Sequence, residues 1–216
     1  MHGLIDYYAP TNPAADPDDI RPGDIFEDQP AYVPAEFGIR LTNLGPTGAG
    51  DPDFELCGRT QDIFEHPPTR RFGGLAYGEA LVVSKAKWAR PVVVLAAGGK
   101  ALLAGPNKAR ATGTYLCAPV YGADQFSAEL RRRLAAYAFP NLFYLPASDW
   151  PPFGEGFVRF DHMQAIRTSH LRNRRHAALT DEAMAVMNDW LAYYLTGSLE
   201  PGSPLAAYRE EQLSRL

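Results

Sequence analysis

Residues 90–96 read Arg-Pro-Val-Val-Val-Leu-Ala, a run of branched apolar residues that follows an arginine and a proline. β-branched side chains favour extended backbone, and so little polarity is typical of a strand covered on both faces. A second run lies at 114–121 and reads Thr-Tyr-Leu-Cys-Ala-Pro-Val-Tyr. The two runs predict the centre of a β-sheet.

Shorter strands are predicted on both sides of this centre. Glycine, proline and other turn residues separate several stretches in which apolar residues alternate or cluster. The stretches are 21–27, 37–41, 80–83, 142–145 and 156–160.

Three helices complete the prediction. Ser127 can accept a hydrogen bond from the first turn of a helix, and Pro140 cannot continue that helix. Thr180 caps a longer helix that runs toward Gly197, and a short one is expected at 205–216. The order of elements indicates a mainly β fold with helices (α+β), built on a small, strongly bent antiparallel sheet.

The composition indicates a globular protein with unevenly distributed charge. Of 216 residues, 46% are hydrophobic and 21% are charged, which is enough apolar material for a buried core. The net charge is −4, yet residues 1–60 carry eleven acidic and three basic side chains. Residues 61–180 carry sixteen basic and eight acidic ones. The first part is therefore acidic and the next part basic.

We expect one domain at 21–197, with a long insertion at about 28–77 where glycines and prolines interrupt the strand pattern. Prolines and aspartates between residues 9 and 19 favour an extended, mobile chain. Residues 1–20 are therefore expected to form a flexible acidic segment. Residues 198–216 are expected to be a tail or the short helix.

Cysteine use and hydropathy point to the cytoplasm. Cys57 and Cys117 lie sixty residues apart without a Cys-x-x-Cys pattern, which disfavours a disulfide scaffold and a zinc finger. The N-terminal residues lack a basic region followed by an apolar run, and no stretch approaches the ~20 apolar residues of a membrane span. We expect a cytoplasmic protein with no membrane partner.

Nucleotide, metal and serine-hydrolase motifs lack support. Gly99-Lys100 is followed by Ala101 and lacks the upstream glycine of a P-loop, and no Gly-x-Ser-x-Gly stretch occurs. His162, His170 and His176 are spaced by eight and six residues, which fits no recognised metal triad. We expect neither a metal nor a cofactor.

Basic residues in the second half could form a surface that binds nucleic-acid phosphates, with Phe143, Tyr144 and Trp150 as stacking faces. The candidates are Arg131, Arg132, Arg133, Arg172, Arg174 and Arg175. A solvated charged face explains the same pattern, because clustering in sequence does not establish clustering in space.

Four stretches, in this order, resemble the PemK/MazF toxin family. They are Arg21-Pro22-Gly23-Asp24-Ile25, the Arg90–Leu95 run, Ala118-Pro119-Val120, and Gly156 to Ile166 leading to Leu171. A fifth, 178–184, is similar to the entry of the family's C-terminal helix. The resemblance implies an SH3-like PemK/MazF-type barrel with a C-terminal helix, and a homodimer.

The resemblance also implies an activity. Toxins of this family are endoribonucleases that cleave single-stranded RNA without a metal, by attack of the 2′-hydroxyl, and small acidic antitoxin proteins bind them. Arg90 matches the family's catalytic arginine. The chemistry suits that residue, because a guanidinium can donate two parallel hydrogen bonds to the extra negative charge of the transition state.

The chain departs from the family at the second catalytic position. The alignment places Tyr121 where the family has a threonine, and a tyrosine with its ordinary pKa near ~10 is a poor base at neutral pH. His162 is a further candidate for proton transfer, because an imidazole can act as acid or base. The family has an arginine in the segment that aligns with His162-Met163-Gln164, and this chain lacks it. Arg167, three residues later, could substitute for that arginine in binding RNA.

Two alternatives follow from these departures. A barrel that has lost its threonine could be a catalytically inactive protein-interaction or regulatory module. The acidic first 60 residues could lie over the basic face and compete with RNA, or they could be a solubilising tail. An enzyme acting on another class of substrate has no motif in its favour.

Overall fold

The computed structural model describes residues 3–13, 19–33, 38–42, 53–57, 85–100, 113–171 and 173–216. The chain divides into two compact units, of which one comprises Met1–Ala31 with Trp88–Leu216 and the other Tyr32–Lys87. Within the second unit, β3 (Gly38–Thr42) pairs antiparallel with β4 (Asp53–Cys57), and Ile39 faces Leu56. This unit overlaps the insertion expected at 28–77. The strand expected at 80–83 lies outside the described residues.

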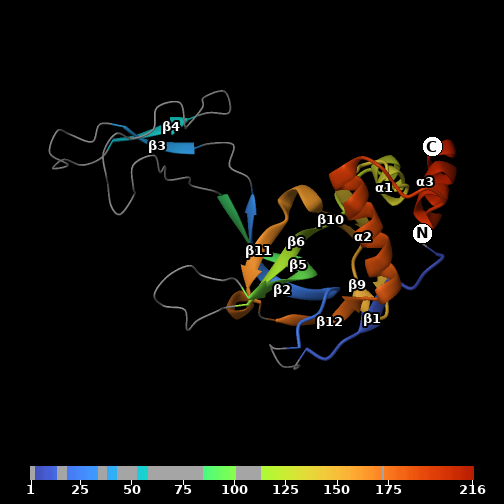
Figure 1. Ribbon diagram of the computed structural model, residues 1–216, viewed down its shortest axis with the longest axis horizontal. Coiled ribbons are helices and arrows are strands. Elements are labelled where there is room, and N and C mark those ends of the chain that lie inside the picture. The colour runs from blue at the N-terminus through green and yellow to red at the C-terminus, as the bar shows by residue number, and fades with distance from the viewer. Residues whose placement is uncertain are drawn as a thin grey trace. The chain divides into compact units, whose positions relative to one another are not determined.

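Eight of the described strands form one antiparallel sheet that curls into a half-barrel (Figure 1), while β3 with β4 and β8 with β9 form two separate pairs. Its strand order is β1-β12-β2-β5-β6-β10-β7, with β11 also paired to β6. The strands are β1 (Tyr8–Pro10), β2 (Asp24–Val33), β5 (Lys85–Lys100), β6 (Gly113–Gly122), β7 (Leu142–Leu145), β10 (Gly156–Arg159), β11 (Gln164–Arg167) and β12 (Arg174–Leu179). The mixed strand and helix architecture confirms the predicted class.

The turn before β2 depends on a glycine. Gly23 has φ of 94°, and a β-carbon there would lie 2.9 Å from the carbonyl oxygen of Leu179. The Asp24 carboxylate accepts a hydrogen bond from the backbone N–H of Arg21 at 2.8 Å, which closes the turn. The turn and strand predicted at 21–27 therefore form as the sequence indicated.

Strand β6 pairs with two successive strands along the same edge. Val158 of β10 faces Val120, and Gln164 of β11 faces Cys117. Six positions separate Val158 from Gln164, whereas three separate Cys117 from Val120. The three additional residues form the 3₁₀ turn η1 (Phe160–His162) beside Pro119, which has no N–H for a ladder.

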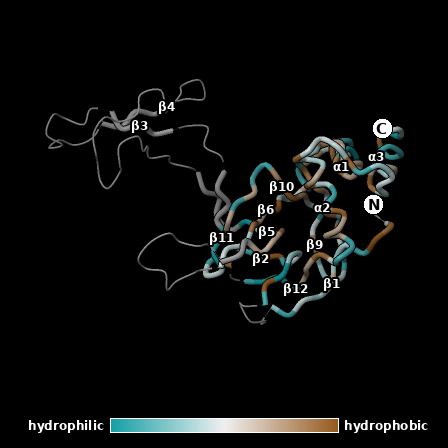
Figure 2. The backbone as a smooth tube through the Cα atoms, in the orientation of Figure 1, coloured by the Kyte–Doolittle hydropathy of each residue, from teal (hydrophilic) through white to brown (hydrophobic). Residues whose placement is uncertain are grey.

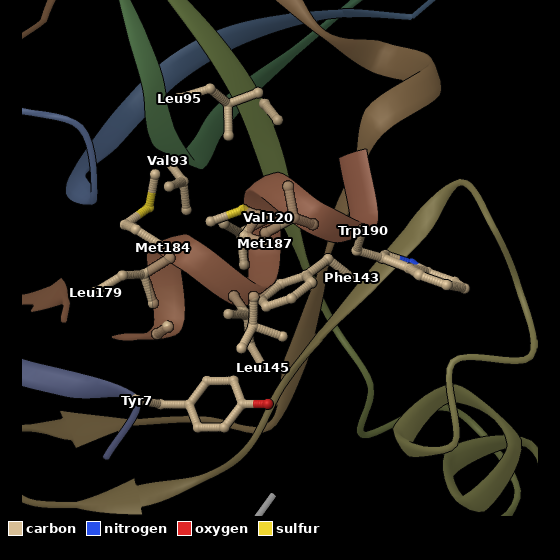
Figure 3. Close-up of a cluster of buried hydrophobic side chains, with 14 of the residues drawn as sticks. Tyr7, Val93, Leu95, Val120, Phe143, Leu145, Leu179, Met184, Met187 and Trp190 are labelled. Atoms are coloured by element: carbon tan, nitrogen blue, oxygen red, sulfur yellow. The ribbon is translucent and has the colours of Figure 1, made fainter. Parts of the chain in front are cut away.

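The larger hydrophobic core lies between the sheet and α2 (Asp181–Thr196), as Figure 3 shows. Val93 and Leu95 of β5 enter this core, whereas Val92 and Val94 pack into a second cluster with Cys117 and Ile166. The run that opened the sequence analysis is thus buried on both faces, as predicted. Hydrophobic residues mark α2 and the middle of the sheet in Figure 2.

The first two helices begin at their predicted capping residues, and α1 (Ala128–Ala135) ends before the stop expected at Pro140. The hydroxyl of Thr180 accepts from the N–H of Ala183, and Gly197 ends α2 with φ of 76°. Ser127 caps α1. The third helix, α3 (Pro204–Ser214), confirms the helix predicted near the C-terminus.

The N-terminal segment differs from the sequence expectation. Residues 1–20 were expected to be flexible, but Tyr8–Pro10 pair with β12 and Tyr7 is 5% exposed. The hydroxyls of Tyr7 and Tyr137 lie 3.0 Å apart in the core. The expectation of flexibility was based on the prolines and aspartates after residue 9. It did not take into account Tyr7 and Tyr8, whose burial against the sheet stabilises the position of this segment. Residues 14–18 lie outside the described residues.

Candidate functional site

Arg90 and Tyr121 meet across β5 and β6. Val92 faces Pro119 in the antiparallel register, and Arg90 lies two residues before Val92 while Tyr121 lies two residues after Pro119, which places both at the same end of the two strands. The central guanidinium carbon of Arg90 lies 5.1 Å from the centroid of the Tyr121 ring, which is a cation–π distance. Both side chains are partly exposed. The predicted arginine is therefore accessible and sits on the predicted tyrosine.

His162 completes the predicted trio. The Tyr121 hydroxyl lies 3.0 Å from Nδ1 of His162, and the imidazole tautomer sets which group donates. His162 is the last residue of η1, so the three additional residues of this turn bring its ring to the end of β6. His162 is only 9% exposed. A solvent-borne ligand therefore meets Arg90 and Tyr121 before it meets His162.

Two more charged residues belong to the cluster and were not selected from the sequence: Arg159 at the end of β10 and Asp161 within η1. The guanidinium carbon of Arg159 lies 5.8 Å from the Tyr121 centroid. Arg159 forms an ion pair with Asp161, and its Nε donates to that carboxylate at 3.1 Å. The other carboxylate oxygen lies 3.8 Å from Nε2 of His162. The available signal was the sequence Arg159-Phe160-Asp161-His162, whose charges alternate with an apolar residue.

The pKa shifts assign protonation states to this cluster. Burial raises the pKa of Tyr121, although Arg159 and Arg90 act in the opposite direction. Tyr121 is thus a proton donor at neutral pH. Burial acts to raise the pKa of Asp161, but hydrogen bonds from Arg159 and Asn141 outweigh it and hold the pKa below its usual value. Asp161 is a carboxylate close to His162.

An aromatic stack extends from the cluster. The ring of Phe157 lies 5.7 Å from that of Tyr121 at an interplanar angle of 18°. Phe126 stacks on Phe157 at 5.2 Å and 21°. The stack fixes the Tyr121 ring, so its hydroxyl is held at the His162 side.

The predicted RNA-binding arginines do not lie on one element. Arg131 of α1 pairs with Glu155 at 3.0 Å, Arg133 lies over the ring of Phe139, and Arg132 is exposed. Arg167 is exposed at the end of β11.

Arg174 has a different environment from the other candidates. It pairs with Asp24 at 2.6 Å, and the two side chains are 7% and 8% exposed. A guanidinium buried in this way is shielded from a phosphate chain, and its removal would leave the Asp24 carboxylate buried without a cation. Arg172 lies outside the described residues.

Within the described ranges, no group of three or more His, Cys, Asp or Glu residues is arranged to hold a metal ion. Among those same residues, no helix combines the length and the apolar character that crossing a bilayer requires.

Comparisons with protein-family models, curated proteins and solved structures find no match to this chain. The arrangement of the site must therefore be interpreted from its chemistry. Two guanidiniums lie over one ring, and the hydroxyl of that ring contacts a histidine that has a carboxylate nearby. Such a set can bind an anion and move a proton at the same place.

Proposed function

We propose that this protein binds single-stranded RNA and cleaves it without a metal, as PemK/MazF toxins do. The observation that supports the proposal is the contact of Arg90 with Tyr121, whose hydroxyl lies 3.0 Å from His162. The chain's half-barrel sheet would be a variant of the SH3-like barrel of that family. A cytoplasmic location, a homodimer and a small acidic antitoxin belong to the same proposal.

The proposed reaction is an internal transfer at one phosphate. The 2′-oxygen forms a bond to phosphorus after its proton leaves to solvent, and the bond from phosphorus to the 5′-oxygen breaks. Arg90 donates hydrogen bonds to the non-bridging oxygens, where negative charge increases in the transition state. Tyr121, which is protonated at neutral pH, donates a proton to the departing 5′-oxygen, and Arg159 and Arg90 favour this loss by acting against the effect of burial on its pKa. His162 restores the proton of Tyr121 through their hydrogen bond.

Arg159 and Asp161 support these roles. The ion pair between them fixes Arg159 beside the ring, and the Asp161 carboxylate stabilises the protonated imidazole of His162. Tyrosine in place of the family's threonine thus changes which group moves the proton without removing a proton donor from the site.

Cleavage of a long RNA in the presence of a chelator tests this proposal. We expect the parent protein to cleave, and Arg90→Ala and Tyr121→Phe each to lower the rate by about 100-fold or more. Arg215→Ala is the matched control, because Arg215 is an exposed arginine on the C-terminal helix end, 65% exposed and paired with Glu211. No cleavage by the parent, or equal rates for parent and Arg90→Ala, would contradict the proposal.

The second candidate, an inactive interaction module, is favoured by one observation. His162 is 9% exposed and lies behind Tyr121, so it reaches a ligand only through that hydroxyl. If this candidate is right, we expect the protein to cleave no RNA under any condition. We also expect the Tyr121→Phe variant to bind a protein partner as tightly as the parent does.

A further inference from the structure

A groove of about 640 Å³ lies between the hairpin of β8 (Ser148–Asp149) with β9 (Pro152–Phe153) and strand β12. Its lining includes Ser148, Phe153, Arg175 and His176. The volume falls within the ~300–1,000 Å³ of typical ligand sites. In the sheet order, β2 and β5 separate β12 from β6, so this groove is distinct from the Tyr121 cluster.

Aromatic packing gives the groove a fixed cation. The guanidinium carbon of Arg175 lies 5.1 Å from the centroid of the Phe153 ring. The ring of Tyr8 also stacks on the ring of Phe153, with centroids 4.7 Å apart. The Tyr8 hydroxyl donates a hydrogen bond to the carbonyl of Pro146 at 2.8 Å. The N-terminal strand therefore holds Phe153 in place, and Phe153 in turn orients Arg175.

A carboxylate already occupies one side of this cation. Arg175 forms an ion pair with Glu27 through its Nε. The Arg175 side chain is 28% exposed and that of Glu27 is 44% exposed, so solvent reaches the pair. An ion pair this exposed is weak because water screens it. A phosphate can replace the Glu27 carboxylate on Arg175.

The hairpin also presents a large exposed aromatic side chain. Trp150, between β8 and β9, is 78% exposed, whereas Trp190 is fully buried. His176, on the β12 side of the groove, is exposed as well. Trp150 thus belongs to the hairpin on one side of the groove, and Arg175 and His176 belong to the strand on the other. Proteins that bind single-stranded nucleic acid combine aromatic rings that stack on bases with cations that bind phosphates.

We propose that this groove binds single-stranded nucleic acid, with a phosphate on Arg175 and His176 and a base stacked on Trp150. The proposal deepens the proposed function and rests on it for the choice of RNA, since the groove would hold a part of the strand away from the cleaved phosphate. Glu27 competes with that phosphate, so the acidic N-terminal part of the chain limits affinity at one defined residue.

The test uses a fluorescent 2′-O-methyl RNA of about twelve nucleotides, which covers a typical ~4–16-nucleotide site and cannot be cleaved by 2′-hydroxyl attack. Binding to the full chain is measured by anisotropy at several salt concentrations. We expect Arg175→Gln and Trp150→Ala each to weaken binding by about 10-fold, and Arg175→Gln to reduce the salt slope by about one. We expect Glu27→Gln to tighten binding severalfold. This gain cannot result from misfolding.

Arg215→Gln is the matched control, because Arg215 is also an exposed arginine paired with a glutamate. Unchanged binding in Arg175→Gln and Trp150→Ala would overturn the proposal. The proposal would also be overturned if a poly-glutamate peptide displaced the RNA and bound with the same affinity as the RNA. That result would assign the groove to an acidic protein segment. The outcome for the groove can be distinguished from the outcome for cleavage. If Arg175→Gln and Trp150→Ala weaken binding but Arg90→Ala has no effect on the cleavage rate, only the proposed function is contradicted.

Discussion

Arg90 and Arg174 are two arginines on the same sheet with opposite environments. Each lies over an aromatic ring, with Arg90 5.1 Å from Tyr121 and Arg174 5.7 Å from Phe26. Arg174 also has the Asp24 carboxylate at 2.6 Å and a side chain that is 7% exposed, whereas Arg90 is partly exposed. The neighbouring groups and the access of solvent, rather than the residue type, decide whether a guanidinium has a structural role or can act on a ligand.

The largest expected effect separates the two arginines by stability. Arg174→Ala leaves the Asp24 carboxylate buried without its cation, so we expect a loss of about 3–5 kcal/mol in the free energy of unfolding. Arg90→Ala should cost about 1 kcal/mol or less, since its cation–π contact is partly solvated. Urea unfolding of the two variants measures both values. Equal losses would remove the distinction drawn between the two sites.

A smaller effect compares the two carboxylates through pH. Burial raises the pKa of Asp24 despite Arg174, whereas Asp161 has a lowered pKa because the hydrogen bonds from Arg159 and Asn141 outweigh its burial. The folded state therefore binds the Asp24 proton more tightly than the unfolded chain does, and this contribution to stability falls as pH rises above the usual Asp value of ~3.9. The Asp161 contribution is present above that value and is lost as pH falls below it.

Unfolding midpoints of Asp24→Asn and Asp161→Asn, measured against the parent from acid to neutral pH, check these signs. We expect the parent to lose stability relative to Asp24→Asn as pH rises through the window above ~3.9. Relative to Asp161→Asn, the parent should lose stability as pH falls through the window below it. Parallel curves for the two variants would show that the two carboxylates have the same environment.

Local sequence determined much of the sheet and the helices. The apolar runs at 91–96 and 114–121 form the middle of β5 and β6, and Thr180 and Gly197 bound α2 because capping depends on neighbouring residues alone. Strands β1 and β12 were missed because their pairing joins residues about 170 positions apart, as Tyr8 with Leu179. Such contacts leave no local pattern.

The candidate site was predictable in part. Arg90, Tyr121 and His162 were selected through the family resemblance, and the structure brings the three together. The charges of Arg159 and Asp161 are visible in the sequence, but the three-residue shift in register at η1 that brings the two residues to Tyr121 is not predicted by it. The grouping of Arg174 with the RNA-binding residues followed from charge alone. The sequence does not reveal that Asp24, 150 positions earlier, pairs with it.

A double-mutant cycle on RNA cleavage tests the central claim, that Arg90 and Tyr121 act on the same phosphate. Cleavage rates are measured with a chelator for the parent, Arg90→Ala, Tyr121→Phe and the double variant. If the two residues act as a unit, the double variant should be about as slow as the slower single variant. Rate losses that multiply in the double variant, or a parent that does not cleave RNA, would contradict the account.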